Sequence, residues 1–258
     1  MERPLVFITG ASSGIGQALA ERYYQAGWDL ALAARRTGEI QAWAAGARLD
    51  PARYAVYAAD VAQIDSIVAA GGRCLAQQGV PQVVIANAGI SIGVDTAIRE
   101  DLDVIARTYA TNNVGLAATF HPFIAAMAAR GSGTLVGIAS VGGIRGMPGH
   151  GAYCASKAAV ISYCESLRGE LRPAGVKVVT ICPGYVDTPL TRGNRYAMPF
   201  LLQPAQFADR AFRAIGRGSS WRVIPWPMAI VSVVLRWLPN ALFDRLLAGR
   251  PRKRRQGE

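Results

Sequence analysis

Residues 4–16 read PLVFITGASSGIG, an apolar run that leads directly into a glycine-rich turn. The run shows no polar alternation, which is typical of a strand buried on both faces of a parallel sheet. A helix-forming stretch, QALAERYYQAG, follows the last glycine. This order presents backbone N–H groups and a helix N-terminus to a pyrophosphate, and an unliganded turn is the weaker alternative. The residues expected to hold a dinucleotide are Gly10, Ser12, Ser13, Gly14, Ile15 and Gly16.

Apolar strand-like runs recur along the 258 residues and alternate with helix-forming stretches. They lie near residues 4–9, 29–34, 53–58, 82–86, 133–139, 175–181 and 221–225. The alternation predicts an α/β fold of Rossmann type, a doubly wound seven-stranded parallel sheet with helices on both faces. One such domain is expected over residues 1–225. We expect residues 226–249 to add short apolar helices packed on it, and residues 250–258 to form a basic, disordered tail.

The end of the second strand-like run, residues 29–34, bears on cofactor choice. A site for NAD usually has an acidic residue about 20 residues beyond the glycine turn, where it binds the ribose 2′-OH. Here Ala34 stands at that place and is followed by Arg35 and Arg36. A small side chain leaves room for a 2′-phosphate, and a guanidinium pairs with it bidentately. The sequence therefore predicts NADP(H) in preference to NAD(H), with solvated surface arginines as the alternative.

A second cluster has the composition of a proton-transfer site. Residues 152–171 have helical apolar spacing, which places Tyr153 and Lys157 one turn apart on the same face. An ammonium beside a phenol lowers the phenol pKa from its usual ~10 and lets it exchange a proton with an oxygen. Ser140 ends a predicted strand, where its hydroxyl is placed to hydrogen-bond a carbonyl. Lys157 is also one of only three lysines among 28 basic residues.

Taken together, these motifs resemble the short-chain dehydrogenase/reductase family over residues 4–225. The resemblance adds Asn112, three residues before Gly115, to Ser140, Tyr153 and Lys157 as a catalytic set. In that family the serine orients the carbonyl and the tyrosine protonates it. The lysine also binds the nicotinamide ribose, and the asparagine holds a water in a proton relay. Asn113 is the neighbouring alternative, but the Asn-x-x-Gly register favours Asn112.

The resemblance also implies further cofactor contacts and a homo-oligomer, a dimer or tetramer. Asp60 and Val61 follow the third predicted strand and resemble the pair beside the adenine ring. Asn87, Ala88 and Gly89 resemble the family's Asn-Ala-Gly turn. The segment PGYVDT at residues 183–188 resembles the one that contacts the nicotinamide carboxamide. Its contributing residues are Pro183, Gly184, Val186 and Thr188.

The activity implied by the resemblance is NADPH-dependent reduction of a ketone or aldehyde, or oxidation of a secondary alcohol. An apolar or lipid-like substrate is expected, because residues 189–203 resemble the family's substrate lid and the predicted wall is hydrophobic. The wall residues are Ile144, Met147, Pro148, Tyr185, Met198, Phe200 and Leu201, with Arg145, Arg192 and Arg195 as the nearby charges. The alternative is a catalytically silent NADP(H)-binding redox sensor, which the presence of both Tyr153 and Lys157 disfavours.

Composition argues against several other classes of protein. The four Cys and two His show no metal-ligand spacing, so we expect no metal and reduced core thiols. The net charge of +11 is partly terminal and lacks a recognition motif, which argues against nucleic acid. The first apolar run is too short for a secretory leader, so a cytoplasmic protein is expected.

The C-terminal region holds a 13-residue apolar stretch, residues 223–235, which is short of the ~20 needed to span a bilayer. Two helices are expected instead, at about 227–238 and 240–248, broken at Pro239. Their apolar residues pack on the protein's own core or a partner subunit, or they lie peripherally on an anionic membrane.

Overall fold

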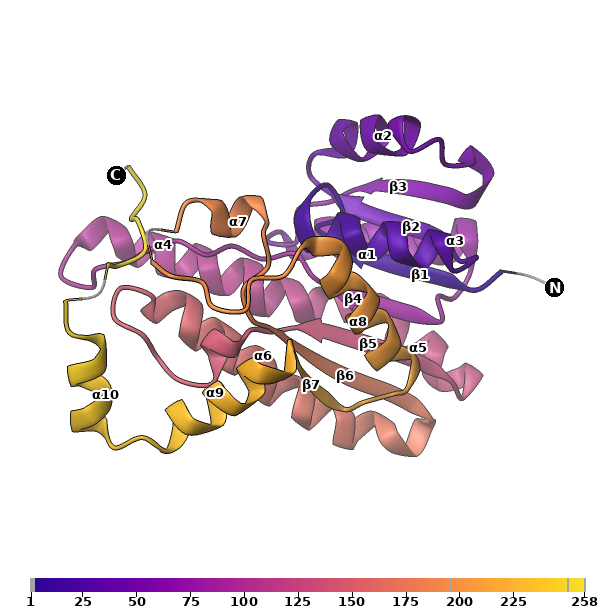
Figure 1. Ribbon diagram of the computed structural model, residues 1–258. Helices are drawn as coiled ribbons and strands as arrows, with labels where there is room; N and C mark the ends of the chain where they lie inside the picture. Colours follow the sequence, from indigo (N-terminus) through magenta and orange to yellow (C-terminus); the bar gives the residue numbers. More distant parts are fainter. Residues whose placement is uncertain (1–2, 195, 250, 258) are drawn as a thin grey trace.

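The computed structural model describes residues 3–194, 196–249 and 251–257. Its centre is one parallel sheet of seven strands in the order β3-β2-β1-β4-β5-β6-β7 (Figure 1). The strands are β1 (Leu5–Thr9), β2 (Asp29–Ala34), β3 (Tyr54–Ala58), β4 (Val83–Ala86), β5 (Gly133–Ile138), β6 (Val176–Pro183) and β7 (Trp221–Ile224). The predicted Rossmann-type fold is confirmed, with strand limits within one or two residues of those expected.

Helices cover both faces of the sheet (Figure 1). One face packs against α3 (Ile64–Gln78), α5 (Gly115–Arg130) and α6 (Gly151–Leu171). The other packs against α1 (Gly14–Gln25), α2 (Thr37–Gly46) and α8 (Pro204–Gly216). Successive side chains of a strand point to opposite faces. In β1, Phe7 therefore joins the first layer while Val6 and Ile8 join the second, which is why this strand is apolar throughout.

Strand order reverses between β1 and β4, which lie side by side although β2 and β3 separate them in sequence. In open α/β sheets, ligands bind outside the carboxyl ends of the strands at such a switch point. The glycine turn after β1 and the segment after β4 both lie there. The fold alone thus predicts where a ligand binds.

The two C-terminal helices form where the sequence predicted them, as α9 (Trp226–Trp237) and α10 (Asn240–Leu247). Arg145 holds both. It donates to the carbonyls of Leu235 and Leu238, the latter at 2.6 Å, and its guanidinium lies 3.8 Å from the Phe243 ring centroid. The expectation that Arg145 is a charge at the substrate wall is therefore wrong, because its donors are used by the helix ends.

The described part of the tail, residues 251–257, lies against the protein, beside α4 (Arg99–Tyr109) and α7 (Pro189–Arg192) (Figure 1). Disorder was predicted for residues 250–258, from their charge alone. Residues 250 and 258 lie outside the described residues, and within 251–257 Arg255 pairs with a buried counter-ion, Asp101, at 2.7 Å. None of the described helices combines the length and the hydropathy needed to cross a membrane.

Candidate functional site

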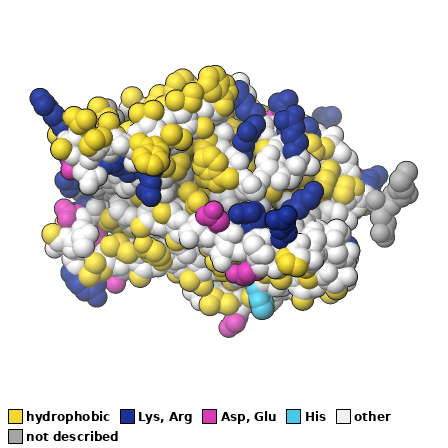
Figure 2. Space-filling model, turned by 90° about the horizontal axis from the view of Figure 1, so that it is seen from below, with side chains coloured by type: hydrophobic (Ala, Val, Ile, Leu, Met, Phe, Trp, Pro, Cys, Tyr) yellow, Lys and Arg dark blue, Asp and Glu magenta, His cyan; other side chains and the backbone are white. Residues whose placement is uncertain are grey.

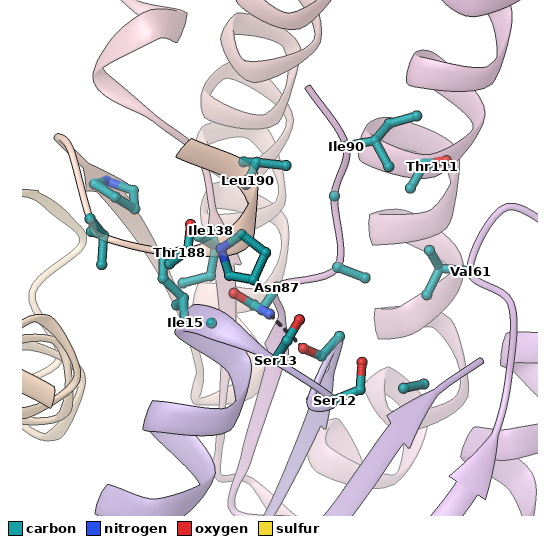
Figure 3. Close-up of a pocket in the computed structure, with 18 of the residues that line it drawn as sticks. Ser12, Ser13, Ile15, Val61, Asn87, Ile90, Thr111, Ile138, Thr188 and Leu190 are labelled. Atoms are coloured by element: carbon teal, nitrogen blue, oxygen red, sulfur yellow. Dashed lines mark hydrogen bonds between the residues drawn. The ribbon is translucent and has the colours of Figure 1, made fainter. Parts of the chain in front are cut away.

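A pocket of about 500 Å³ opens at the carboxyl ends of the strands (Figure 3). It is lined by every residue predicted to contact the cofactor except Gly16. Its walls come from the turns after β1, β2, β3 and β4 and from the segments after β5 and β6. Figure 3 shows Ser12, Ser13 and Ile15 of the glycine turn on one side, with Asn87, Ile138, Thr188 and Leu190 beyond them.

The glycine turn has the geometry of an anion cradle. Gly10 and Gly14 have φ values of +67° and +58°, which favour glycine. A Cβ at Gly16 would lie 2.2 Å from the Gly10 carbonyl oxygen, so only glycine lets α1 begin this close to β1. Within the described α1, Ser13 makes no side-chain cap and the first turn has no acidic residue. Its first N–H groups and positive dipole end therefore fit a pyrophosphate.

Arg36 lies next to this cradle. Its Nη2 is 3.3 Å from the hydroxyl oxygens of both Ser12 and Ser13, and its Nη1 is 3.1 Å from Glu39 Oε1. Arg35 lies beside Asp60, which was predicted to contact the adenine ring, and its Nη1 is 3.8 Å from Asp60 Oδ2. A guanidinium and two hydroxyls thus converge near the end of β2, where Ala34 provides no carboxylate. This donor set fits a 2′-phosphate.

Thr9 connects the end of β1 to the segment after β4 by hydrogen bonds, a role that the sequence reasoning missed. Its hydroxyl oxygen accepts the N–H groups of Asn87 at 3.1 Å and Ala88 at 3.2 Å. In return, Asn87 Nδ2 donates to the Thr9 carbonyl at 3.0 Å. The signal available in the sequence was a single polar residue closing an otherwise apolar strand.

Ser140, Tyr153 and Lys157 all line the same pocket. Ser140 follows β5 and its Oγ accepts the Gly142 N–H at 3.1 Å. Tyr153 lies in the first turn of α6, and one turn later Lys157 is buried with its Nζ donating to the Ile138 carbonyl at 2.8 Å. Strand end and helix start therefore bring a hydroxyl, a phenol and an ammonium together beside the cofactor pocket.

Asn112 is buried behind this group in a π-helical segment, Ala110–Val114, between α4 and α5. Such segments are rare and frequent at functional sites. Its Oδ1 accepts the Ile90 N–H at 2.8 Å, and its Nδ2 donates to Ser156 Oγ at 2.9 Å. A Cβ at Gly89 would lie 3.1 Å from Asn112 Oδ1 and 3.4 Å from Lys157 Nζ. Asn112 therefore faces the predicted catalytic group without lining the pocket itself.

Asn113 bonds the main chain of the same serine, since its Nδ2 donates to the Ser156 carbonyl at 2.8 Å. Ser156 is a residue that the sequence reasoning missed. It is fully buried, and its hydroxyl joins Asn112 to the Tyr153 carbonyl, to which it donates at 2.8 Å. These hydrogen bonds thus link Asn112, the predicted relay residue, to the backbone of Tyr153, the predicted acid.

Burial governs the electrostatics of the site. It raises the pKa of Tyr153 to about 12, and the hydrogen bond with Ser140 lowers that value only in part. It also lowers the pKa of Lys157 to about 8. The expectation that the neighbouring ammonium lowers the phenol pKa is thus wrong for this structure. The Lys157 Nζ lies 5.9 Å from the Tyr153 ring centroid, and its hydrogen bond goes to Ile138.

The substrate side is only partly as predicted. His150 Nε2 lies 3.2 Å from the Tyr196 hydroxyl, and the Tyr185 ring centroid is 6.2 Å from that of Tyr196. Two predicted wall residues, Phe200 and Leu201, are exposed instead. Ile144, another predicted wall residue, lines a different groove beside α6 and β7. Of the charges predicted near the wall, Arg192 pairs with Asp187 at 3.1 Å, and Arg195 lies outside the described residues.

No cluster of three or more His, Cys, Asp or Glu suited to a metal occurs in the part of the chain that the structure describes. The four Cys are free and buried.

Comparison with known proteins supports the same interpretation. The family model described as short chain dehydrogenase matches residues 4–198. An uncharacterized oxidoreductase of Myxococcus xanthus is 38% identical, over 92% of this chain and 93% of its own. A dehydrogenase/reductase SDR family protein 7-like of Drosophila melanogaster is 32% identical, over 98% and 82%.

Two solved structures are similar over nearly their whole length. A short-chain dehydrogenase from Sphingobium yanoikuyae in complex with NADPH has a TM-score of 0.79 and 27% identity, over 99% of this chain and 98% of its own. The bulky-bulky ketone specific alcohol dehydrogenase from Comamonas testosteroni has a TM-score of 0.78 and 25% identity, over 100% and 97%.

Proposed function

Since the chain belongs to the short-chain dehydrogenase/reductase family, we propose that it is an NADPH-dependent reductase of an apolar ketone or aldehyde, or oxidises the matching secondary alcohol. The observation that carries the proposal is one pocket with two ends. At one end Arg36 converges with Ser12 and Ser13, and at the other Ser140, Tyr153 and Lys157 meet. A bound NADPH would supply the hydride.

The protein's own residues supply the proton. With a pKa of about 12, Tyr153 is a neutral phenol at physiological pH, the form that donates a proton to a carbonyl oxygen. Ser140 is placed to hydrogen-bond the same oxygen as negative charge develops on it. The pKa of about 8 for Lys157 leaves a cation near neutral pH beside the pocket.

Cofactor preference rests on Arg36. Replacing it with Ala removes the donors that face Ser12 and Ser13, so we expect the Kd of NADPH to rise about tenfold or more, as for the loss of a charge-assisted pair. The Kd of NADH should hardly change. Arg99→Ala, an exposed arginine on α4, is the matched control. NADH binding as tightly as NADPH to the unmodified protein would rule out the preference.

Substrate class rests on a solved relative that is named for bulky ketones. The test is NADPH oxidation with ketones and aldehydes of graded chain length, where we expect the rate to rise with size. The alternative is a silent NADP(H)-binding redox sensor. Tight NADPH binding with no turnover across the panel would favour it.

The solvent-facing side of α9 suggests a partner surface. Its packed side carries Met228 and Ser232, whereas Trp226 and Trp237 are 71% and 82% exposed. The exposed apolar stripe is Trp226, Ile230, Val233, Val234 and Trp237. Figure 2 views the molecule from the side of α9 and α10 and shows hydrophobic side chains gathered on this face, with Lys and Arg, and also Asp and Glu, around them. We propose that this face meets an anionic membrane surface, because its exposed tryptophans and the neighbouring exposed Arg236 and Arg245 suit contact with anionic lipid.

Flotation with phosphatidylserine vesicles tests this. We expect the full chain to float, and the Trp226→Ser/Trp237→Ser double variant to remain in solution. Phosphatidylcholine vesicles are the control for charge. If the chain does not float but forms a dimer that the double variant loses, the face is a subunit contact instead. The homo-oligomer and the cytoplasmic location stay predictions.

A further inference from the structure

The described C-terminal residues 251–257, here called the C-terminal strap, cross three loops that border the substrate side. The first is residues 90–95, which begin at Ile90 of the pocket. The Gly93 N–H donates to the Arg254 carbonyl at 2.8 Å. A Cβ at Gly93 would lie 2.2 Å from the Lys253 carbonyl oxygen, so the strap backbone fills the space that a side chain would need.

The second loop ends at Gly149, just before His150 and Tyr153. Gly149 has a φ of +73°, and a Cβ there would lie 2.9 Å from Arg252 Cβ. Its carbonyl accepts the Val94 N–H at 3.1 Å, which couples this loop to the first. The strap therefore lies over two glycines in two loops that are themselves hydrogen-bonded.

The third contact is with the segment that resembles a substrate lid. Lys253 Nζ donates to the Leu190 carbonyl at 2.9 Å and to Asn194 Oδ1 at 2.7 Å. Leu190 also lines the cofactor pocket (Figure 3). A single lysine of the strap thus bonds the lid segment, whose Leu190 lines the pocket.

One ion pair anchors the strap. Arg255 Nε and Nη2 lie 2.7 Å and 3.2 Å from the two carboxylate oxygens of Asp101, whose side chain is 3% exposed. Asp101 Oδ2 also accepts the Asp95 N–H at 2.6 Å. The hydrogen bond from Arg255 is the main reason that the pKa of Asp101 lies below its ordinary value, so the pair stays charged at neutral pH. A buried bidentate pair fixes both position and orientation.

Resting on the proposed reductase function, we propose that the C-terminal strap is the outer wall of the substrate site and that Arg255 is the positioning residue that holds it closed. The strap joins the lid to the loops at Gly93 and Gly149, on the side away from the cofactor. Its position limits how far these loops separate. It thereby sets the size of carbonyl compound that is admitted to Tyr153.

Hydrogen exchange on the full chain tests the anchor without any substrate. In Arg255→Ala we expect faster exchange at residues 90–95 and 188–194, because the Gly93 amide loses its acceptor and the lid loses Lys253. Arg255→Lys keeps the positive charge but loses the bidentate geometry of the guanidinium. Its exchange rates should therefore lie between those of the unmodified protein and Arg255→Ala. Arg254→Ala is the matched control, because among the described residues Arg254 bonds through its main-chain carbonyl alone and its side chain is exposed. Unchanged exchange in Arg255→Ala would overturn the proposal.

Steady-state kinetics then test the wall. We expect Arg255→Ala to shift the ratio of kcat/KM for a bulky ketone over a small one about tenfold toward the bulky one, the order of discrimination that an apolar wall provides. Faster exchange with an unchanged ratio would show that the strap is structural only, and would refute the wall. If no carbonyl compound is reduced, the reductase function fails, and the wall that rests on it fails with it. The exchange result then still decides whether Arg255 holds the loops.

Discussion

Ser156 offers a sharp test of how the site is built. Its buried hydroxyl accepts from Asn112 Nδ2 at 2.9 Å and donates to the Tyr153 carbonyl at 2.8 Å. Ser156→Ala removes both bonds and leaves Asn112 with its two bonds to Ile90. Each net contribution is about 1 kcal/mol, so we expect a loss of about 2 kcal/mol in the free energy of unfolding. For a chain of this size that lowers Tm by about 4–8 °C.

The control is Ser166→Ala on the same helix, where the hydroxyl is exposed and bonds Glu170 at 2.9 Å. Both variants gain the same helix propensity, so that effect cancels. Denaturant unfolding gives the stability difference, and kcat should fall in Ser156→Ala alone, because Asn112 is less firmly held. A Ser156→Ala protein as stable and as active as Ser166→Ala would refute the link.

Two further outcomes follow from burial and packing. The pKa of Lys157 is about 8 in the fold against an ordinary 10.5, so between these values the unfolded chain binds more protons and stability rises with pH. The stability of Lys157→Met relative to wild type should therefore decline from pH 7.5 to pH 9.5, and a constant difference would contradict the shift. Gly16→Ala places a Cβ 2.2 Å from the Gly10 carbonyl oxygen and should cost about 1–3 kcal/mol of stability and weaken NADPH binding. Gly46→Ala, with open space around it, should change neither stability nor NADPH binding. If Gly16→Ala is as stable and binds NADPH as tightly as Gly46→Ala, the glycine turn tolerates a side chain.

The strands, and the position of Tyr153 and Lys157 in one pocket, were predictable because they depend on local patterns. A strand buried on both faces must be apolar throughout, as β1 is, and a Tyr and a Lys four apart on a helix must share a face. The glycine turn was predictable for a similar reason, since a close approach of backbone to backbone excludes any side chain. These are properties that neighbouring residues set.

What the sequence hid depends on contacts across the fold. Arg145 looked like a charge at the substrate wall, but its donors serve helix ends about 90 residues away. The basic tail looked solvated because its counter-ion, Asp101, is 154 residues distant in sequence. The pKa of Tyr153 was also misjudged, since the sequence shows the neighbouring cation and not the depth of burial. A linear sequence pattern shows neither which distant residues become partners nor how strongly a group is desolvated.

The central claim is that the neutral phenol of Tyr153 gives its proton to the carbonyl oxygen. The most direct measurement is the turnover of Tyr153→Phe with NADPH and a reducible ketone, beside Tyr163→Phe on the exposed face of the same helix. We expect kcat for Tyr153→Phe to fall about 10²–10⁴-fold, the usual contribution of a positioned acid, while the Kd of NADPH stays within about twofold. A Tyr153→Phe enzyme that turns over as fast as Tyr163→Phe would contradict the assignment.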